Sequence, residues 1–204
     1  MKTYTVKLIE GKTNNLIWQK ANSLIDFSSP WDSEFIKKTE FKAVHNSEYI
    51  FFQFKVNDHQ THIHVSEDKN DSINNSDRVE LFFRCDASLT PYYCLEIDSK
   101  SRIMDFKSLP NKDFNFNWNW PLKDIDVKSS VKQNHYIIEI KISIKSLNNL
   151  NLIKKGVIET GIYRAKYKKQ EDNTFKPTWI TWVNPGTDEP NFHTPTSFGI
   201  LKLE

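Results

Sequence analysis

The amino-acid sequence predicts an all-β protein, specifically a two-sheet antiparallel β-sandwich of the jelly-roll or immunoglobulin-like type. Short segments in which apolar and polar residues alternate recur along the whole chain, and helical periodicity is almost absent. The chain has 204 residues, of which 38% are hydrophobic and 13% aromatic, so it can close a core. We expect one domain across residues 1–204, because no repeat or linker divides the sequence.

The alternating segments are the expected strands. In chain order they are 3–9, 40–46, 48–56, 77–85, 92–98, 102–106, 124–131, 135–144, 157–169, 177–183 and 198–204. The segments on either side of Asn46 and Ser47 read as a hairpin, because Asn tolerates the backbone of a tight turn. One short helical turn is expected near 145–150.

Two cysteines, Cys85 and Cys94, lie in neighbouring expected strands joined by a short turn. Successive side chains of a strand point to opposite faces, so Cys85 shares a face with Phe83, and Cys94 shares one with Tyr92. When the apolar faces of the two strands are matched, the thiols point to opposite sides of the sheet. We therefore expect no disulfide, and the redox compartment of the protein stays open.

Charge and composition argue against several classes of ligand. Lys and Arg total 28 against 26 Asp and Glu, whereas a nucleic-acid-binding domain would carry a strong basic excess. No apolar run approaches the ~20 residues that span a bilayer, so no membrane partner is expected. The N-terminus lacks the pattern of a secretory signal, and the location of the protein stays unknown. With five Gly in the chain, nucleotide-binding loops are not expected either.

Three long connections interrupt the expected strands, at 57–76, 107–120 and 184–197. The first is polar, the second interleaves aromatic residues with Asn, and the third holds three prolines. Long loops on a rigid β scaffold usually carry the binding residues, so we expect the functional site among them.

Four pieces of sequence occur in an order that resembles a known family. They are DRVELFF (77–83), YYCLEID (92–98), YIIEIKISIKSL (136–147) and the stretch from GIYRAKY (161–167) through WITWVNP (179–185) to NFHTPTSFGIL (191–201). Over roughly residues 25–204 this set resembles carbohydrate-binding module family 9 and the family-9-like sugar-binding domains. The resemblance implies a β-sandwich that binds a mono- or oligosaccharide, of the kind derived from plant polysaccharides, without catalysis.

Aromatic side chains are the first candidates for a sugar site, because sugars stack their apolar C–H faces on rings while polar side chains hold the hydroxyls. The resemblance implies that the ring of Trp182 is an open jaw of a sugar clamp, with Asn184 beside it. Trp179, three residues earlier, faces the other side of an extended strand. It is also a candidate for the site, but of these two tryptophans it is the one expected in the core. Trp118 and Trp120 lie in an Asn-rich loop and could supply a further ring.

Glu80 points off the apolar face of its strand and resembles the family's Glu that takes sugar hydroxyls. Arg164 offers a planar fork of donors to neighbouring hydroxyls, and Arg102 resembles a second family Arg near the ligand. One position departs from the family. Its other clamp Trp lies six residues before the strand Glu, where this sequence has Asn74. A two-ring clamp is therefore not implied, and the cleft could use a single ring.

Metal binding is only weakly indicated. His62 and His64 alternate onto one face, but no Cys or further ligand spacing accompanies them. Asp71 and Asp77 belong to an acidic stretch without EF-hand spacing, where the resemblance allows a structural calcium ion. No other cofactor is expected, and His193 is expected to be structural.

Two other functions stay open. A small β-sandwich glycoside hydrolase or lyase would need an acid and a base about 5–9.5 Å apart, which Glu80 could form with Glu96 or Glu139. A domain of the related DOMON type would carry haem or bind another protein. If the chain binds sugar, a glycoside hydrolase is a candidate partner. The sequence does not indicate the saccharide or the oligomeric state.

Overall fold

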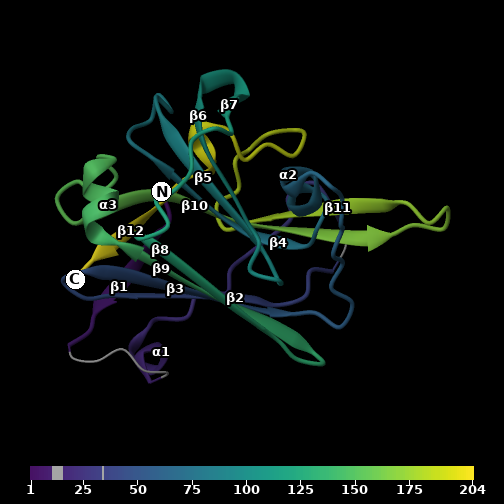
Figure 1. The fold of residues 1–204 in the computed structure, drawn as a ribbon, viewed down its shortest axis with the longest axis horizontal. Coiled ribbons are helices and arrows are strands. Elements are labelled where there is room, and N and C mark those ends of the chain that lie inside the picture. Colours follow the sequence, from purple (N-terminus) through teal and green to yellow (C-terminus); the bar gives the residue numbers. More distant parts are fainter. Residues whose placement is uncertain (11–15, 34) are drawn as a thin grey trace.

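The computed structural model describes residues 1–10, 16–33 and 35–204, and β-strands dominate this described chain (Figure 1). The strands are β1 Thr3–Leu8, β2 Thr39–His45, β3 Tyr49–Asn57, β4 Arg78–Arg84, β5 Tyr92–Asp98, β6 Ile103–Leu109, β7 Asp113–Asn115, β8 Ile125–Val131, β9 His135–Ser143, β10 Val157–Lys169, β11 Phe175–Thr181 and β12 Gly199–Leu203. The helices are α1 Ile17–Lys20, α2 Lys69–Asn74 and α3 Ile144–Asn149, with 3-10 turns at Pro110–Lys112 and Pro195–Ser197. None of these helices is long and apolar enough to cross a membrane.

Every expected strand has an observed counterpart, and the expected helical turn is α3. α3 begins after Ser143, whose hydroxyl accepts the backbone N–H of Ser146 at 3.0 Å. Besides the 3-10 turns, three elements were not expected: α1, which lies between β1 and β2, and β7 and α2, which both lie within the long connections. α2 begins after Asp68, whose carboxylate accepts the N–H of Asp71 at 2.8 Å. Its polar sequence carries no apolar stripe, which is why periodicity did not reveal it.

The strands form one continuous sheet, which corrects the expected two-sheet antiparallel sandwich. In the described residues its order is β7-β6-β5-β4-β10-β12-β1-β2-β3-β9-β8, with β11 paired to β10 beside this path. β1 causes the difference, because it pairs in parallel with both β12 and β2 and so joins two antiparallel halves. This pairing of distant segments leaves no trace in local alternation, which reports only which side chains share a face.

The sheet curls so strongly that its two halves face each other across the main core. Phe52 of β3 lies 6.3 Å from Phe83 of β4, ring centroid to ring centroid, although these strands are far apart in the sheet order. On β4, Val79 and Leu81 also point into this main core. The side chains between them, at positions 80 and 82, therefore point to the outer face of the sheet.

A second, smaller cluster of buried residues covers that outer face, and we call it the outer cluster. Its members are Ile73, Phe82, Leu89, Tyr92, Cys94, Met104, Phe106, Tyr163, Phe192 and Phe198. The chain after β11 crosses back over this face, where Phe192 stacks on Tyr163 with ring centroids 4.1 Å apart. Ile73 of α2 belongs to the same cluster. The outer cluster therefore holds both α2 and the loop 184–197 against the sheet.

The two cysteines point to opposite faces of the sheet, as predicted. Cys94 is buried in the outer cluster, whereas Cys85 packs against the main core. Both are free thiols, and burial raises the pKa of each. Neither is therefore an activated thiolate.

Candidate functional site

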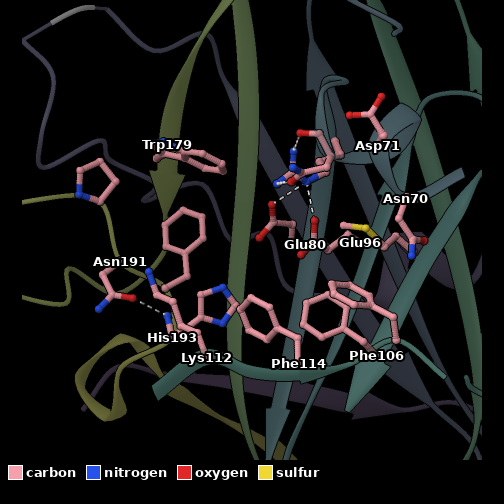
Figure 2. Close-up of a pocket in the computed structure, with 16 residues that line it drawn as sticks. Asn70, Asp71, Glu80, Glu96, Phe106, Lys112, Phe114, Trp179, Asn191 and His193 are labelled. Carbon is pink, nitrogen blue, oxygen red and sulfur yellow. Dashed lines mark hydrogen bonds and ion pairs between the residues drawn. The ribbon is translucent and has the colours of Figure 1, made fainter. Parts of the chain in front are cut away.

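A pocket of about 340 Å³ opens on the outer face of the sheet, where β4, β5 and β6 meet α2 and the chain after β11. Figure 2 shows the carboxylates of Glu80 and Glu96 between Trp179 on one side and the rings of Phe106 and Phe114 on another. Of the residues predicted to bind a ligand, Glu80 and Trp179 line this pocket.

Glu80 and Glu96 lie directly opposite each other on β4 and β5 and share the guanidinium of Arg78. Nε of Arg78 donates to Oε2 of Glu96 at 2.6 Å and lies 2.9 Å from Oε1 of Glu80. Arg78 and Glu80 point to the same face because they are two residues apart on one strand. All three side chains are at most 5% exposed. We call this buried ion-pair cluster the charged centre.

The charged centre holds a proton that exposed carboxylates would release. Burial, reinforced by the charge of Glu96 and opposed by Arg78, raises the pKa of Glu80 well above its usual range. Burial also raises the pKa of Glu96, although Arg78 acts against this shift. Because the two carboxylates interact, they titrate as a pair, and the raised pKa values favour one proton shared within the pair.

α2 brings the amide side chains of Asn70 and Asn74 to the pocket. The backbone carbonyl oxygen of Asn74 accepts hydrogen bonds from Nη1 of Arg78 and from the hydroxyl of Tyr167, both at 2.6 Å. These bonds fix the end of α2 beside the charged centre. Position 74 is where the family resemblance implies a clamp Trp. The structure places this position at the pocket, with an amide in place of a ring.

Trp179 of β11 is half-buried and forms one end of the pocket. Its ring lies 5.4 Å from the guanidinium carbon of Arg78, and Phe192 packs edge-on against it with ring centroids 5.6 Å apart. Contacts with a cation and with a second ring hold the indole in one orientation. Trp179 therefore offers a fixed aromatic surface to a ligand.

Another wall carries the rings of Phe106, Phe114 and Phe116, from β6 and β7 and the residue that follows β7. The ring of Phe106 lies 5.0 Å from that of Phe114 and 4.8 Å from that of Phe116, between centroids. Phe116 is 44% exposed, so this wall reaches solvent at the mouth of the pocket.

The two tryptophans expected from this same loop do not line the pocket. Trp120 is buried in the main core, where its Nε1 donates to Oγ of Ser146 at 3.1 Å. Trp118 packs against Tyr93 with ring centroids 4.8 Å apart. Phe114, Phe116 and these tryptophans alternate with Asn, but β7 ends at Asn115 and the chain then turns. The two phenylalanines therefore stay at the pocket while the tryptophans reach the other side of the sheet.

Trp179 and Trp182 lie on opposite faces, as their spacing predicts, but their places are exchanged. Trp182, expected to be open, is 1% exposed in the main core, whereas Trp179, expected in the core, lines the pocket. Gly199 permits this packing of Trp182, because a Cβ at that position would lie 2.4 Å from the indole ring. Spacing tells which residues share a face, and only the sheet tells which face is covered.

Arg164 lies on the side of β10 that faces away from the pocket. It is in register with Val79, whereas its neighbour Tyr163 is in register with Glu80. Strand alternation therefore turns the guanidinium away from Glu80, and its Nη2 donates to Oδ2 of Asp58 at 2.8 Å. Arg164 was expected to offer donors to the hydroxyls of a ligand, but it lies outside this pocket, and Arg78 is the arginine beside Glu80.

Two more candidate ligand-binding residues lie outside the pocket, where their hydrogen bonds stabilise the local structure. Nε of Arg102 donates to Oδ2 of Asp98 at 2.6 Å, and its Nη2 donates to the carbonyl of His64. Asn184 is exposed, and its side-chain oxygen accepts the backbone N–H of Gly186 at 2.9 Å in a turn.

His193, expected to be structural, lines the pocket beside Phe114, with ring centroids 4.9 Å apart. Its Nδ1 lies 3.0 Å from the hydroxyl of Tyr92. Burial, followed by the charges of Lys112 and Arg78, lowers the pKa of His193 to about 3. The imidazole is therefore neutral at physiological pH and adds no charge to the pocket.

Within the described ranges, no group of three or more His, Cys, Asp or Glu side chains could hold a metal ion. The weak metal candidates have other partners. His62 stacks on Phe175 with centroids 3.7 Å apart, and Nε2 of His64 lies 3.3 Å from Asp71. Asp77 is buried and accepts Nζ of Lys166 at 2.7 Å. The suggested calcium ion therefore has no ligand cluster in this part of the chain.

Arg78 is the charged pocket residue next to Glu80 that the sequence did not reveal as a candidate. Its signal was its spacing, because Arg78 and Glu80 are alternate residues of one strand and so share the outer face. Phe114 and Phe116 carried a similar signal, as the first rings of an alternating series. Glu96 was considered only as a catalytic partner, although its register with Glu80 places it in the same centre.

Three solved structures share this fold and align with 100% of the chain. A candidate carbohydrate-binding protein from Bacteroides uniformis ATCC 8492 has a TM-score of 0.75 at 16% identity, with 99% of that protein covered. A carbohydrate-binding module of family 9 from Caldicellulosiruptor kristjanssonii has a TM-score of 0.63 in complex with glucose and 0.61 in complex with cellotriose, both at 14% identity. The alignments cover 96% and 94% of those two chains.

The sequence itself was compared with protein families. No match to a curated protein was found. The family model described as carbohydrate family 9 binding domain-like matches residues 9–204, which is nearly the whole chain. The chain therefore belongs to the carbohydrate family 9 binding domain-like family.

Proposed function

We propose that the pocket on the outer face binds a neutral saccharide without catalysis. The observation that carries this proposal is Oε1 of Glu80, which is buried at the pocket and has no hydrogen-bond partner among the described residues. Nε of Arg78 lies 2.9 Å away, but it carries a single hydrogen, and Glu96 accepts that hydrogen. Leaving a buried polar atom unpaired costs free energy, so a ligand that pairs with it gains affinity.

A hydroxyl group suits this position better than a pure donor or a pure acceptor. The carboxyl of Glu80 changes between an acceptor and a donor when it loses or gains its proton, and a hydroxyl can both donate and accept. A hydroxyl therefore satisfies Glu80 in either protonation state. Sugars present several such groups around one ring.

The aromatic walls of the pocket support the other part of sugar recognition, which is the stacking of sugar C–H faces on rings. Trp179 lies on one side of the charged centre and Phe114 on another (Figure 2), and Phe116 also lines the pocket. Rings placed beside a polar group can cover the C–H faces of a sugar while its hydroxyl edge points to the polar group. In this arrangement the ring missing at Asn74 is replaced from the other side of the pocket, by the phenylalanines.

The charge balance favours a neutral ligand. Arg78 carries one positive charge, and the Glu80–Glu96 pair with its retained proton carries one negative charge. At the rim, Lys112 and Asp71 offset each other. The lining as a whole therefore carries no net charge, which matches a neutral sugar better than an anionic or a cationic one.

Calorimetric titration with glucose and cellotriose tests the proposal, since these are the ligands of two structures with the same fold. We expect binding by the wild type and a loss of about 10-fold or more for Glu80→Met, which keeps the volume but removes the hydrogen-bonding group. Glu159→Met is the matched control, because Glu159 pairs with Arg84 outside the pocket. Equal affinity of wild type and Glu80→Met, or no binding of either sugar, would overturn the proposal.

A glycoside hydrolase is the second candidate, and the raised pKa of Glu80 beside Glu96 favours it. A hydrolase needs one carboxyl that protonates the leaving group and another that acts as nucleophile or base. In the charged centre both carboxylates form ion pairs with the same guanidinium. This arrangement supports ligand binding more than catalysis. Reducing-sugar release from cellotriose decides the question. Turnover that disappears in Glu80→Gln would replace the binding proposal with this one.

A further inference from the structure

A second groove, of about 380 Å³, lies on the outer face of the other half of the sheet, beside α1. We call it the α1 groove. Its lining includes Trp18, Gln53, Lys128, Ser130, Ile137 and Glu139. We propose that the α1 groove is a second saccharide-binding site, for a neutral oligosaccharide, that shares no residue with the pocket.

Trp18 is the aromatic element of the α1 groove. It packs against the small cluster of Ile9, Val44 and Phe51, and its Nε1 donates to Oε1 of Glu139 at 2.7 Å. Trp is highly buried in most folds, yet Trp18 stays partly exposed and borders the groove. An indole that is fixed by packing and by a hydrogen bond, and is partly open, is a surface on which a sugar ring can stack.

A row of polar side chains crosses the floor of the groove. Gln53 of β3 is in register with Glu139 of β9, which is in register with Lys128 of β8. Nε2 of Gln53 also donates to Oε1 of Glu139 at 2.9 Å, so two donors orient this carboxylate. In the next row, Ser130 is in register with Ile137 and adds a hydroxyl beside an apolar side chain. Amide, carboxylate, ammonium and hydroxyl groups that line one groove provide donors and acceptors for several sugar hydroxyls.

The charges of this lining offset each other. Lys128 contributes one positive charge and Glu139 one negative charge, and the other side chains named here are neutral. Such a surface does not favour nucleic acid or a charged peptide, which would leave charges unpaired. A neutral ligand rich in hydroxyls matches both the balance of charge and the number of polar groups.

The two sites lie on opposite outer faces of the curled sheet. The pocket opens on the half built from β4, β5 and β6, and the α1 groove on the half built from β3, β9 and β8, with the main core between them. A short saccharide in one site therefore cannot touch the other site. The domain would bind two saccharide chains, or two segments of one long saccharide. A substitution in one site can therefore abolish binding there without affecting the other site.

Site-resolved NMR tests this proposal through the indole N–H signals of Trp18 and Trp179. Trp18→Phe and Trp179→Phe assign the two signals by their loss. Cellotriose, xylotriose, maltotriose and mannotriose are then titrated separately. We expect at least one trisaccharide to shift the Trp18 signal progressively, and to do so also in Trp179→Ala, where the pocket has lost its indole ring.

Two variants probe the groove without removing the bond between Trp18 and Glu139. Gln53→Ala and Lys128→Ala are expected to weaken the binding reported by Trp18 by about 2- to 10-fold, the usual effect of one lost hydrogen bond. Lys7→Ala is the matched control, because Lys7 lies on β1 outside the groove lining and pairs with Glu204 at 2.7 Å. Its affinity should equal that of the wild type.

The outcomes separate the two sites. A Trp18 signal that stays fixed with all four trisaccharides overturns the second site, and the pocket proposal survives if the Trp179 signal moves. Movement of the Trp18 signal alone supports the α1 groove and contradicts the pocket. If neither signal moves, both proposals are wrong.

Discussion

Glu80 and Glu96 are direct cross-strand neighbours whose carboxylates meet at one nitrogen, Nε of Arg78, at 2.9 and 2.6 Å. Two buried acids with one base cannot all be ionised without leaving a negative charge unpaired, so the pair retains a proton. The resulting charged centre is neutral as a whole and still has an unpaired oxygen at the pocket. This combination links the stability of the fold to the chemistry proposed for the site.

The retained proton makes the stability of the protein depend on pH. Because the pKa of Glu80 is raised in the folded state, the folded protein binds more protons than the unfolded chain above the ordinary Glu value of 4.5. Stability therefore falls as the pH rises towards the folded-state pKa. In Glu80→Gln this effect is absent. We expect the free energy of unfolding of Glu80→Gln, relative to wild type, to grow by up to about 1.4 kcal/mol per pH unit.

Urea denaturation of both proteins between about pH 5 and pH 8 measures this difference. Asn191→Ala is the control, since it changes a neutral residue of the same pocket and should follow the wild-type profile. Parallel profiles for Glu80→Gln and wild type would contradict the shared proton.

Removing the Arg78 cation alone should destabilise the fold far more than removing it together with the charges of both carboxylates. Arg78→Met leaves buried carboxylates without their cation, and breaking a buried pair in this way costs about 3–5 kcal/mol. In the Glu80→Gln/Glu96→Gln background no charge is left behind, so the same substitution is expected to cost less than about 1.5 kcal/mol. Denaturation of the four proteins gives both costs. Equal costs in the two backgrounds would show that Arg78 stabilises the fold by packing instead of by charge.

The aromatic wall gives a matched pair of substitutions. Phe116 and Phe175 are 44% and 41% exposed, but Phe116 borders the pocket while Phe175 stacks on His62. We expect Phe116→Ala to weaken saccharide binding by about 2- to 10-fold, the contribution of one ring contact, and Phe175→Ala to leave it unchanged. Calorimetric titration with cellotriose measures both. A loss of affinity in Phe175→Ala, or none in Phe116→Ala, would exclude the phenylalanine wall as a sugar surface.

Local alternation was enough to predict the strands, the opposite faces of the two cysteines and the presence of Glu80 on the outer face. It could not predict that β1 would join the two halves of the sheet, because parallel pairing between distant segments depends on the whole fold. It missed α2, whose polar residues carry no stripe, and with it the anchor of Arg78 at Asn74. The sequence therefore placed Glu80 on the face of β4 where the pocket opens, but it did not reveal that Arg78, and not Arg164, lies beside Glu80.

The exchanged places of Trp179 and Trp182 provide the sharpest test, because one side chain should affect mainly binding and the other mainly stability. Trp182 is buried in the main core against Gly199, so Trp182→Ala is expected to destabilise the protein by about 3–5 kcal/mol. Trp179 is half-buried at the pocket, so Trp179→Ala should cost less stability and should weaken saccharide binding. Urea denaturation and calorimetric titration of both variants separate these effects. If Trp182→Ala kept its stability and lost its ligand, Trp182 would be the ring that holds the sugar, and the pocket described around Glu80 would not be the binding site.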